Sequence, residues 1–336
     1  MIFNTLYFLI VIILQILNNI ECFNFGYVGE AAHYAKCLIT ECCGDKYIIG
    51  DLRRLRSTLD KQLFGQNLAK EVVLNAIRAH WENDFSQKAL TLSFHGPPGT
   101  GKNYVSRMIV DSLYKEGSKS QYVHHFQGRI QFPKEDQADI YKENIYLWIK
   151  GNITKCEKQL FIFDEVDKMP SAVLNGIKPI IDYHDTVEKV DYRKSIFIFL
   201  SNTGSSLIND HYISLWKSGK KRRDIKLKDF EKLIAAGAFN EKGGFHHSDT
   251  IKCNLIDHYI PFLPLEYDHV RSCIYTEFSL RGVSHFQERD ILEVLEGVEW
   301  GPSPENLFSK TGCKRLSQKV AMITQKNYAP PLNDEL

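Results

Sequence analysis

The sequence has no excess of charge of either sign. Its 336 residues contain 42 Lys and Arg against 41 Asp and Glu, a formal net charge of +1. A chain this balanced has no global attraction for nucleic acid or for an anionic membrane surface. We interpret its one basic segment, residues 217–228, as a solvated loop that leads into a helix over 226–236. Internal repeats are also missing, and the ordinary composition predicts a globular protein with room for two packed units.

The sequence also has no apolar run of the roughly 20 residues that a membrane-spanning helix needs. Residues 6–17 form a shorter run, interrupted by Gln15, that is typical of the core of a secretory signal. We predict a signal peptide over 1–22, cleaved after Cys22 with Ile20 at position −3. Because the first residues contain no Lys or Arg, retention as an uncleaved anchor stays open.

The other end of the chain fits the same compartment. Residues 333–336, Asn-Asp-Glu-Leu, differ by one residue from the Lys-Asp-Glu-Leu and His-Asp-Glu-Leu signals that return soluble proteins to the endoplasmic reticulum. We assign residues 331–336 to a retrieval-like tail. Asn152, in Asn152-Ile153-Thr154, is the only acceptor for N-glycosylation, a weak motif by itself.

Eight cysteines match no zinc ribbon or zinc finger spacing. In an oxidising compartment disulfides are the better interpretation. Seven cysteines would remain after cleavage beyond Cys22. An odd number leaves at least one thiol free, reactive or bonded to another molecule. The cysteines are at positions 22, 37, 42, 43, 156, 253, 273 and 313.

A glycine-rich loop follows the apolar run at 90–94. Residues 96–102 fit the phosphate-loop pattern of Gly, four residues, Gly and Lys. Backbone N–H groups of such a loop surround the β- and γ-phosphates, Lys102 neutralises their charge, and the following helix offers its positive end. Asn103 stands where the pattern has Ser or Thr, so its amide oxygen would ligate Mg²⁺ or a metal-bound water. The predicted nucleoside triphosphate site comprises Gly96, Pro97, Pro98, Gly99, Thr100, Gly101, Lys102 and Asn103.

Two further apolar runs end in polar side chains. Residues 160–163 precede Asp164, which would hold the Mg²⁺ shell, and Glu165, which would orient or deprotonate the attacking water. Residues 196–200 precede Asn202, which fits the sensor 1 position of a phosphate-loop ATPase, where it would contact the γ-phosphate or the water. The alternative for Asn202 is a plain turn at the end of a strand.

The order of elements predicts an α/β fold. Helical spacing of apolar residues runs from Asp51 to Trp81. Strand-like runs then alternate with helix-length segments, as in a parallel sheet covered on both faces. After Pro264 only helices are expected, so we place a domain boundary near Leu265. The expected strands are 90–94, 122–126, 160–163 and 196–200, and the expected C-terminal helices are 265–279, 287–295 and 307–325.

These motifs together resemble those of the torsins, AAA+ ATPases of the endoplasmic reticulum and nuclear envelope lumen that are related to the Clp-type unfoldases. Asparagine at the Mg²⁺ position is characteristic of torsins. The resemblance covers residues 37–319 and implies a cysteine-containing lead-in at 23–50, an AAA+ αβα domain at 51–264 and a small helical lid at 265–330. It rests on residues 63–66, 96–103, 164–169, 177–179, 202, 226–229, 262–267 and 312–314.

The resemblance also implies roles for residues far from the phosphate loop. Lys314 would belong to a sensor 2 motif and reach the γ-phosphate from the lid. Cys313 would pair with Cys273, which would couple nucleotide binding to thiol state; two cysteines packed as small hydrophobes are the alternative. A second pair, Cys37 with Cys156, would tie the lead-in to the large domain.

The segment before the first long helix carries a further implied role. Gly65 and Gln66 would line the adenine pocket, with a plain helix-start turn as the alternative. ATP and Mg²⁺ are therefore the expected cofactors, and Glu165, Asn202 and Lys314 the expected catalytic residues.

Two parts of a Clp-type enzyme are missing. The arginine finger motif Asn-Arg-Ile-Asp corresponds to residues 254–257, with Leu255 in place of the arginine. A supplied arginine is worth about 10³ to 10⁵ in the rate of phosphoryl transfer, so the isolated chain should hydrolyse ATP slowly. As in torsins, the lumenal domain of a membrane-anchored activator would supply it. The peptide-gripping Gly-aromatic-Val-Gly loop is also missing after residue 132.

The expected protein is a torsin-like ATPase that forms homo- or hetero-oligomers and remodels protein complexes in nuclear envelope and endoplasmic reticulum organisation. It would meet membranes only through its partner and would not bind nucleic acid. Two alternatives stay open: a self-sufficient Clp-like chaperone, and a nucleotide-gated structural interaction protein whose hydrolysis is incidental.

Overall fold

The computed structural model describes residue 37 and residues 40–328. The chain divides into two units, Met1–Tyr47 and Ile48–Leu336. The predicted signal peptide, most of the predicted lead-in and the predicted tail lie outside the described residues. Within the described part of the chain, no helix is both long enough and apolar enough to cross a membrane.

The first unit contains a disulfide that differs from the predicted one. Cys37 is bonded to Cys42, with 5.4 Å between the Cα atoms, so the predicted pairing of Cys37 with Cys156 is wrong. Closing a loop of five residues orders much less chain than a long-range bond would, and cysteine positions alone do not determine connectivity. Cys156, in the second unit, is buried and is also disulfide-bonded.

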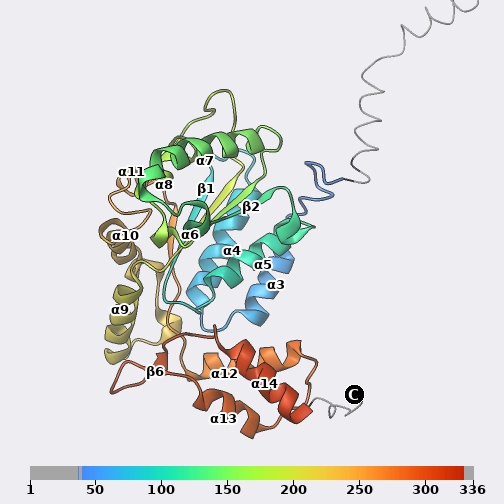
Figure 1. Ribbon diagram of the computed structural model, residues 1–336, viewed down its shortest axis with the longest axis vertical. Helices are drawn as coiled ribbons and strands as arrows, with labels where there is room; N and C mark the ends of the chain where they lie inside the picture. Colours follow the sequence, from blue (N-terminus) through green and yellow to red (C-terminus); the bar gives the residue numbers. More distant parts are fainter. Residues whose placement is uncertain (1–36, 38–39, 329–336) are drawn as a thin grey trace, which may run out of the picture. The chain divides into compact units, whose positions relative to one another are not determined.

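A five-stranded parallel sheet forms the centre of the second unit (Figure 1). The strand order is β2-β3-β4-β1-β5. Four of the five strands are predicted from the sequence. The fifth, β5, was missed because it has only four residues and ends at Pro261, a residue type that is unusual inside a strand. The strands are β1 (Leu90–His95), β2 (Val123–Gln127), β3 (Leu160–Asp164), β4 (Ile196–Ser201) and β5 (His258–Pro261).

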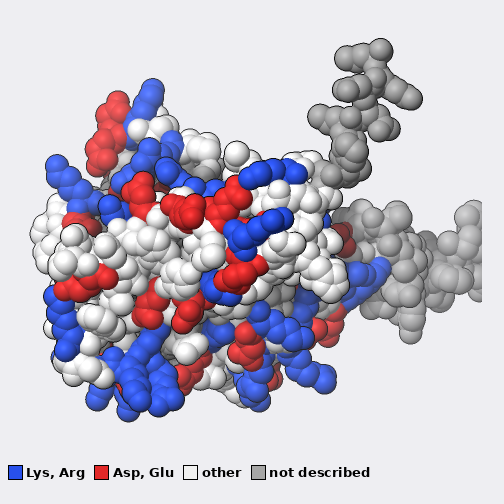
Figure 2. Space-filling view, turned by 90° about the horizontal axis from the view of Figure 1, so that it is seen from below, with Lys and Arg blue, Asp and Glu red and all other residues white. Residues whose placement is uncertain are grey.

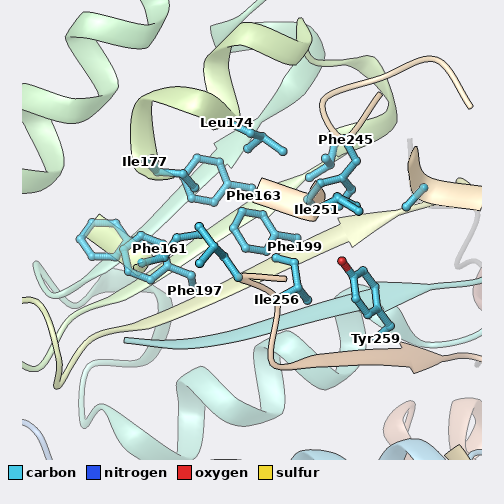
Figure 3. Packing of buried hydrophobic residues seen from close by; sticks show 14 of the residues in the cluster. Phe161, Phe163, Leu174, Ile177, Phe197, Phe199, Phe245, Ile251, Ile256 and Tyr259 are labelled. Atoms are coloured by element: carbon cyan, nitrogen blue, oxygen red, sulfur yellow. The ribbon is translucent and has the colours of Figure 1, made fainter. Parts of the chain in front are cut away.

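Alternate side chains of the strands feed two separate cores. Phe161 and Phe163 of β3 belong to one core, whereas Leu160 and Ile162 belong to the other. Successive residues of a strand point to opposite faces of the sheet. A continuous apolar run that is buried on both faces therefore contributes side chains to both cores. Figure 3 shows the phenylalanine side, where the rings of Phe163 and Phe199 stack with centroids 5.4 Å apart.

Helices cover both faces of the sheet (Figure 1). Helix α3 illustrates why they form: Asp51 caps it by accepting a hydrogen bond from the Arg54 N–H, and Leu55 and Leu59, one turn apart, are buried. On the aliphatic side lie α3 (Leu52–Gln62), α4 (Asn67–Trp81) and α5 (Lys102–Leu113). On the phenylalanine side lie α7 (Ala138–Ile153), α8 (Ser171–Ile181), α9 (Ser205–Lys217), α10 (Glu231–Asn240) and α11 (Asp249–Lys252).

The C-terminal part builds a third core from helices α12 (Tyr267–Leu280), α13 (Glu288–Glu296) and α14 (Leu316–Tyr328). The expectation of helices only is wrong in one place. Two short antiparallel strands, β6 (Trp300–Gly301) and β7 (Phe308–Ser309), precede α14, and β7 lies where the third predicted helix, 307–325, was expected to start. Two residues per strand are too few to produce a periodic pattern.

Short elements complete the second unit. They are α6 (Gly128–Gln131) and the 3₁₀ turns η1 (Gly117–Lys119), η2 (Glu135–Gln137), η3 (Val166–Lys168), η4 (Arg222–Asp224) and η5 (Leu227–Asp229).

Charged side chains of both signs are mixed on the surface. Lys and Arg side chains are interspersed with Asp and Glu on the face shown in Figure 2.

Candidate nucleotide site

A cavity of about 610 Å³ lies where the carboxyl ends of β3 and β4 meet the loop after β1. In open parallel sheets, ligands bind in the crevice outside the carboxyl ends of the strands, at a point where the strand order reverses. Here β1 lies between β4 and β5, so the chain passes from β1 to one side of the sheet and returns past β1 to reach β5. The lining residues include Pro98, Gly99, Thr100, Gly101, Lys102, Asn103, Asp164, Glu165, Asn202, Cys273, Cys313 and Lys314.

The predicted phosphate loop connects β1 to α5. Its glycines at 96, 99 and 101 have φ values of +153°, +78° and +108°, which side chains rarely allow. A Cβ atom at Gly99 would lie 1.9 Å from the Thr311 carbonyl oxygen. The loop therefore needs glycine for its backbone angles and also for its close approach to the C-terminal segment.

Lys102 is the first residue of α5 and is buried below the loop. Its ammonium donates to the Gly96 carbonyl at 2.5 Å and to the Asn202 Oδ1 at 3.0 Å. Burial lowers the pKa of Lys102 to about 8, although the nearby carboxylates of Asp167 and Asp164 oppose this shift. Neutral oxygens thus hold a cation that an anionic phosphate would stabilise.

The two predicted acids and Asn103 lie together across the cavity. The Asn103 Nδ2 donates to the Asp164 Oδ2 at 2.5 Å, and the Glu165 N–H donates to the Asp164 Oδ1 at 2.8 Å. Carboxylate and amide oxygens are ligands that Mg²⁺ accepts, so the donor set fits the predicted metal. Glu165 has φ +53° and faces Arg129, whose Nε lies 3.7 Å from its Oε2.

Asn202 follows β4 and lies between two charged groups. Its side chain accepts from Lys102, and its backbone N–H donates to the Asp167 Oδ1 at 3.1 Å. Burial raises the pKa of Asp167, but hydrogen bonds from Lys168 and from the Asn202 N–H outweigh it and lower the pKa overall. Asp167 keeps its charge and holds the turn that carries Asn202.

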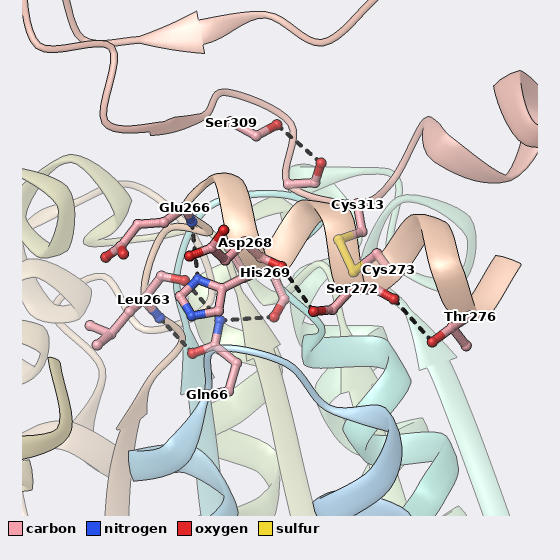
Figure 4. The surroundings of a disulfide bond; sticks show 12 residues. Gln66, Leu263, Glu266, Asp268, His269, Ser272, Cys273, Thr276, Ser309 and Cys313 are labelled. Atoms are coloured by element: carbon pink, nitrogen blue, oxygen red, sulfur yellow. Dashed lines mark hydrogen bonds between the residues drawn. A yellow bond between two sulfur atoms is a disulfide. The ribbon is translucent and has the colours of Figure 1, made fainter. Parts of the chain in front are cut away.

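The C-terminal segment contacts the phosphate loop directly. The Cys313 N–H donates to the Gly99 carbonyl at 3.0 Å. Cys313 is also disulfide-bonded to Cys273 of α12, with 6.3 Å between the Cα atoms (Figure 4). Lys314 follows and lines the cavity. The disulfide is therefore hydrogen-bonded to the loop glycine, directly before the predicted phosphate sensor Lys314.

Gly65 and Gln66 do not line the cavity; Gln62, Leu63 and Phe64 do so instead. The buried Gln66 side chain donates to the Thr100 and Leu263 carbonyls at 3.1 and 2.7 Å and accepts from the Leu263 N–H at 3.0 Å. Figure 4 shows this amide beside Leu263. Gln66 thus joins the start of α4 to the phosphate loop and to the segment after β5.

Sequence reasoning missed Arg222, which lies in the segment interpreted as a solvated loop. Its side chain is only 13% exposed. It donates to the Gly65 carbonyl at 2.7 Å and to the Pro264 carbonyl at 2.9 Å, and it lies beside the Glu266 carboxylate. A run of basic residues does not reveal which member is buried, so no sequence signal distinguishes Arg222 from its neighbours.

Two other predicted positions lie away from the cavity lining. Asn152 is in the last turn of α7, where its Nδ2 donates to the Trp148 carbonyl at 2.8 Å. Leu255 is buried in the core on the phenylalanine side, with a relative exposure of 1%. Among the described cysteines, Cys253 is free and exposed.

Comparisons with known proteins agree with this geometry. The family model described as Torsin matches residues 37–163, and the one described as Torsin-1A, C-terminal domain, matches residues 265–322. A Torsin-like protein of Caenorhabditis elegans is 39% identical over 293 residues, 87% of this chain and 82% of that protein. A Torsin-like protein of Drosophila melanogaster is 38% identical over 316 residues, 91% of this chain and 93% of that protein.

Solved structures of Hsp104 share the fold. The S. cerevisiae Hsp104–ADP complex has a TM-score of 0.56 at 14% identity, covering 82% of this chain and 46% of that chain. A closed state of Hsp104 with ATPγS and FITC casein has a TM-score of 0.55 at 14% identity, covering 83% and 46%. This chain thus spans less than half of the Hsp104 chain. The predicted fold class, an AAA+ α/β sheet domain followed by a helical part, is confirmed.

Proposed function

Because this chain belongs to the torsin family of AAA+ ATPases, we propose that it binds Mg·ATP in the 610 Å³ cavity and hydrolyses it slowly until a partner activates it. The observation that carries the proposal is the buried Lys102, held by the Gly96 carbonyl and by Asn202 directly across from Asp164 and Glu165. A buried cation without a carboxylate in hydrogen-bond contact suits an anionic phosphate.

Each residue has a role that follows from its contacts. The loop N–H groups and Lys102 bind the phosphates, and Asn103 and Asp164 hold the metal. When bound, Mg²⁺ neutralises phosphate charge and orients the phosphate oxygens. Glu165 orients the attacking water or accepts its proton.

Two further residues of the cavity lining would contact the terminal phosphate. Asn202 presents its amide from the end of β4, and Lys314 presents its ammonium from the C-terminal helical segment. We assign the AAA+ domain to residues 51–264 and the lid to 265–330, so that the nucleotide lies between them.

The partner dependence is supported by the burial of Leu255. A leucine that is 1% exposed in the core can neither leave it nor carry charge to a neighbouring subunit. We infer that the lumenal domain of a membrane-anchored activator supplies the arginine within a homo- or hetero-oligomer. The signal peptide, the retrieval-like tail and glycosylation at Asn152 belong to the same proposal of a protein in the endoplasmic reticulum and nuclear envelope lumen. The proposed role is remodelling of protein complexes in the organisation of these membranes.

The test is ATP turnover by the purified chain with and without lumenal domains of candidate activators. We expect very slow turnover alone and an increase of about 10³-fold or more with the right partner. The Glu165→Gln variant should still bind ATP, lose turnover and bind the partner more tightly. Brisk turnover by the chain alone, abolished in Glu165→Gln, would instead establish a self-sufficient chaperone. Equal partner binding by Glu165→Gln and wild type would rule out nucleotide gating.

A further inference from the structure

His95 is a buried ionisable residue next to the cavity that the proposed chemistry does not use. It is the last residue of β1 and directly precedes the phosphate loop. Its relative exposure is 0%, and the rings of Phe245 and Tyr259 lie 6.0 Å away on the phenylalanine side of the sheet. A polar ring in such surroundings is tolerated only when its nitrogens are hydrogen-bonded.

Both ring nitrogens of His95 have partners. Nε2 lies 2.7 Å from the Ser93 Oγ, and Nδ1 lies 3.2 Å from the Thr203 carbonyl oxygen and 3.3 Å from the Thr203 Oγ1. Because the nearer of the two Thr203 oxygens is a carbonyl, which only accepts, we assign the proton to Nδ1; Nε2 then accepts from the Ser93 hydroxyl. Burial lowers the pKa of His95 to about 4, although the hydrogen bond to Thr203 opposes the shift. The ring is therefore neutral near pH 7.

The Thr203 carbonyl belongs to the turn that displays Asn202. Within the turn, the Thr203 N–H donates to the Ser201 Oγ at 3.1 Å. The next N–H, of Gly204, donates to the Glu241 Oε1 at 3.0 Å. His95 joins this turn to the end of β1, and Lys102 joins it to the start of α5 through the Asn202 side chain.

We propose that His95 is a positioning residue: by holding the Thr203 carbonyl, it sets the place at which Asn202 presents its amide to Lys102 and to the terminal phosphate. This inference rests on the proposed ATP hydrolysis. Adjacent strands β1 and β4 carry the two halves of the phosphate site, with His95 paired to Ser201 in register. Small displacements of positioning groups cost large factors in rate because the reacting atoms must meet in one geometry.

The experiment measures partner-stimulated turnover and ATP affinity in three variants. The His95→Leu variant has an apolar side chain that makes neither hydrogen bond of the ring. We expect its kcat to fall about tenfold and its ATP dissociation constant to stay within about twofold of wild type. The Nδ2 of His95→Asn takes the place of Nδ1 and should retain most of the rate. The longer amide of His95→Gln reaches the Nε2 position, contacts Ser93 rather than Thr203, and should behave like His95→Leu.

Thr91→Val is the matched control. Thr91 is fully buried two residues before Ser93 on the same face of β1, and its hydroxyl donates to the Leu255 carbonyl at 2.7 Å, away from Asn202. It should lower stability without changing kcat. If His95→Leu fails to fold, the comparison of His95→Asn with His95→Gln decides the question.

Three outcomes overturn the inference. If His95→Asn is no more active than His95→Gln, or if ATP affinity falls as much as kcat, His95 has a merely structural role. An active wild type with an equally active His95→Leu defeats the inference alone. A wild type that never binds ATP defeats the proposed function as well.

Discussion

At the scale of the residue, buried polar side chains in and around the cavity hold the candidate site together. Lys102, His95 and Gln66 each have less than a tenth of their surface exposed, and each is held by backbone carbonyls. An unpaired polar group in such a place costs about 1–3 kcal/mol, so these residues persist because their partners are fixed. For Lys102 and His95, the pKa values lowered by burial are a measurable consequence.

The stability of the protein should fall in acid because of His95. Its pKa is about 4 in the folded chain and 6.5 in the reference state, so below pH 6.5 the unfolded chain binds a proton that the folded chain does not. The contribution of the neutral His95 ring to the free energy of unfolding is fully present above pH 6.5 and is lost as the pH falls towards 4. Between pH 7.5 and 4.5 we expect wild type to lose about 2 to 3 kcal/mol more than His95→Asn.

Urea unfolding at the two pH values measures this difference. The variant keeps a hydrogen-bond donor but has no ionisable ring, so other histidines contribute equally to both proteins. Parallel curves for wild type and variant would show that His95 does not remain neutral in the folded chain.

At the scale of the element, the phosphate loop packs tightly against the segment after β7. Gly312 has φ +54°, and a Cβ atom there would lie 2.3 Å from the Gly99 carbonyl oxygen. We expect Gly312→Ala to displace the segment and to weaken ATP binding at least about tenfold, since both the loop and Lys314 move. Isothermal titration with ATP checks this.

Gly282→Ala is the control for that substitution. Gly282 has φ +75° with nothing within 4 Å of the added Cβ, so it carries the same backbone strain without the clash. Equal losses of ATP affinity in both variants would assign the effect to strain alone.

A second contact between elements depends on Arg222. It joins the segment before α4 to the segment before α12 through the Gly65 and Pro264 carbonyls. We expect Arg222→Gln to lower the free energy of unfolding by about 2 kcal/mol, because charge-assisted hydrogen bonds in a largely buried site are lost. Arg223→Gln, at a side chain that is 73% exposed, should change it by less than about 0.5 kcal/mol. Equal effects in urea unfolding would contradict this assignment.

At the scale of the whole molecule, the disulfide links the helical part to the nucleotide cavity. Cys273 of α12 and Cys313 are disulfide-bonded and both line the cavity. The Cys313 N–H also donates a hydrogen bond to the Gly99 carbonyl of the phosphate loop. We expect wild type to bind ATP more tightly under oxidising than under reducing conditions, because the bond fixes the backbone that positions Lys314. In Cys273→Ser the affinity should not respond to redox conditions.

Cys253→Ser is the matched variant, since Cys253 is a free, exposed cysteine. Its ATP affinity should respond to redox conditions as wild type does. If Cys273→Ser still responds, the coupling does not pass through this bond.

Much of the fold could be predicted because parallel strands buried on both faces are continuous apolar runs. Runs at 90–94, 160–163 and 196–200 are such strands, and the polar residues after them lie at one edge of the sheet. Strand β5 and the β6–β7 pair were missed because they are too short to show a period. The predicted pairing of Cys37 was wrong, since cysteine positions in a sequence do not determine which of them bond.

The amino-acid order alone determined the phosphate loop, the paired acids and the family, because phosphate chemistry demands particular residues at fixed local spacing. Tertiary structure alone decided that Gln66 clamps Leu263, that Arg222 is buried, and that His95 holds the turn carrying Asn202. These contacts join residues from about 100 to about 200 positions apart. They depend on β1 lying beside β4 and β5, and no local pattern encodes the order in which strands assemble.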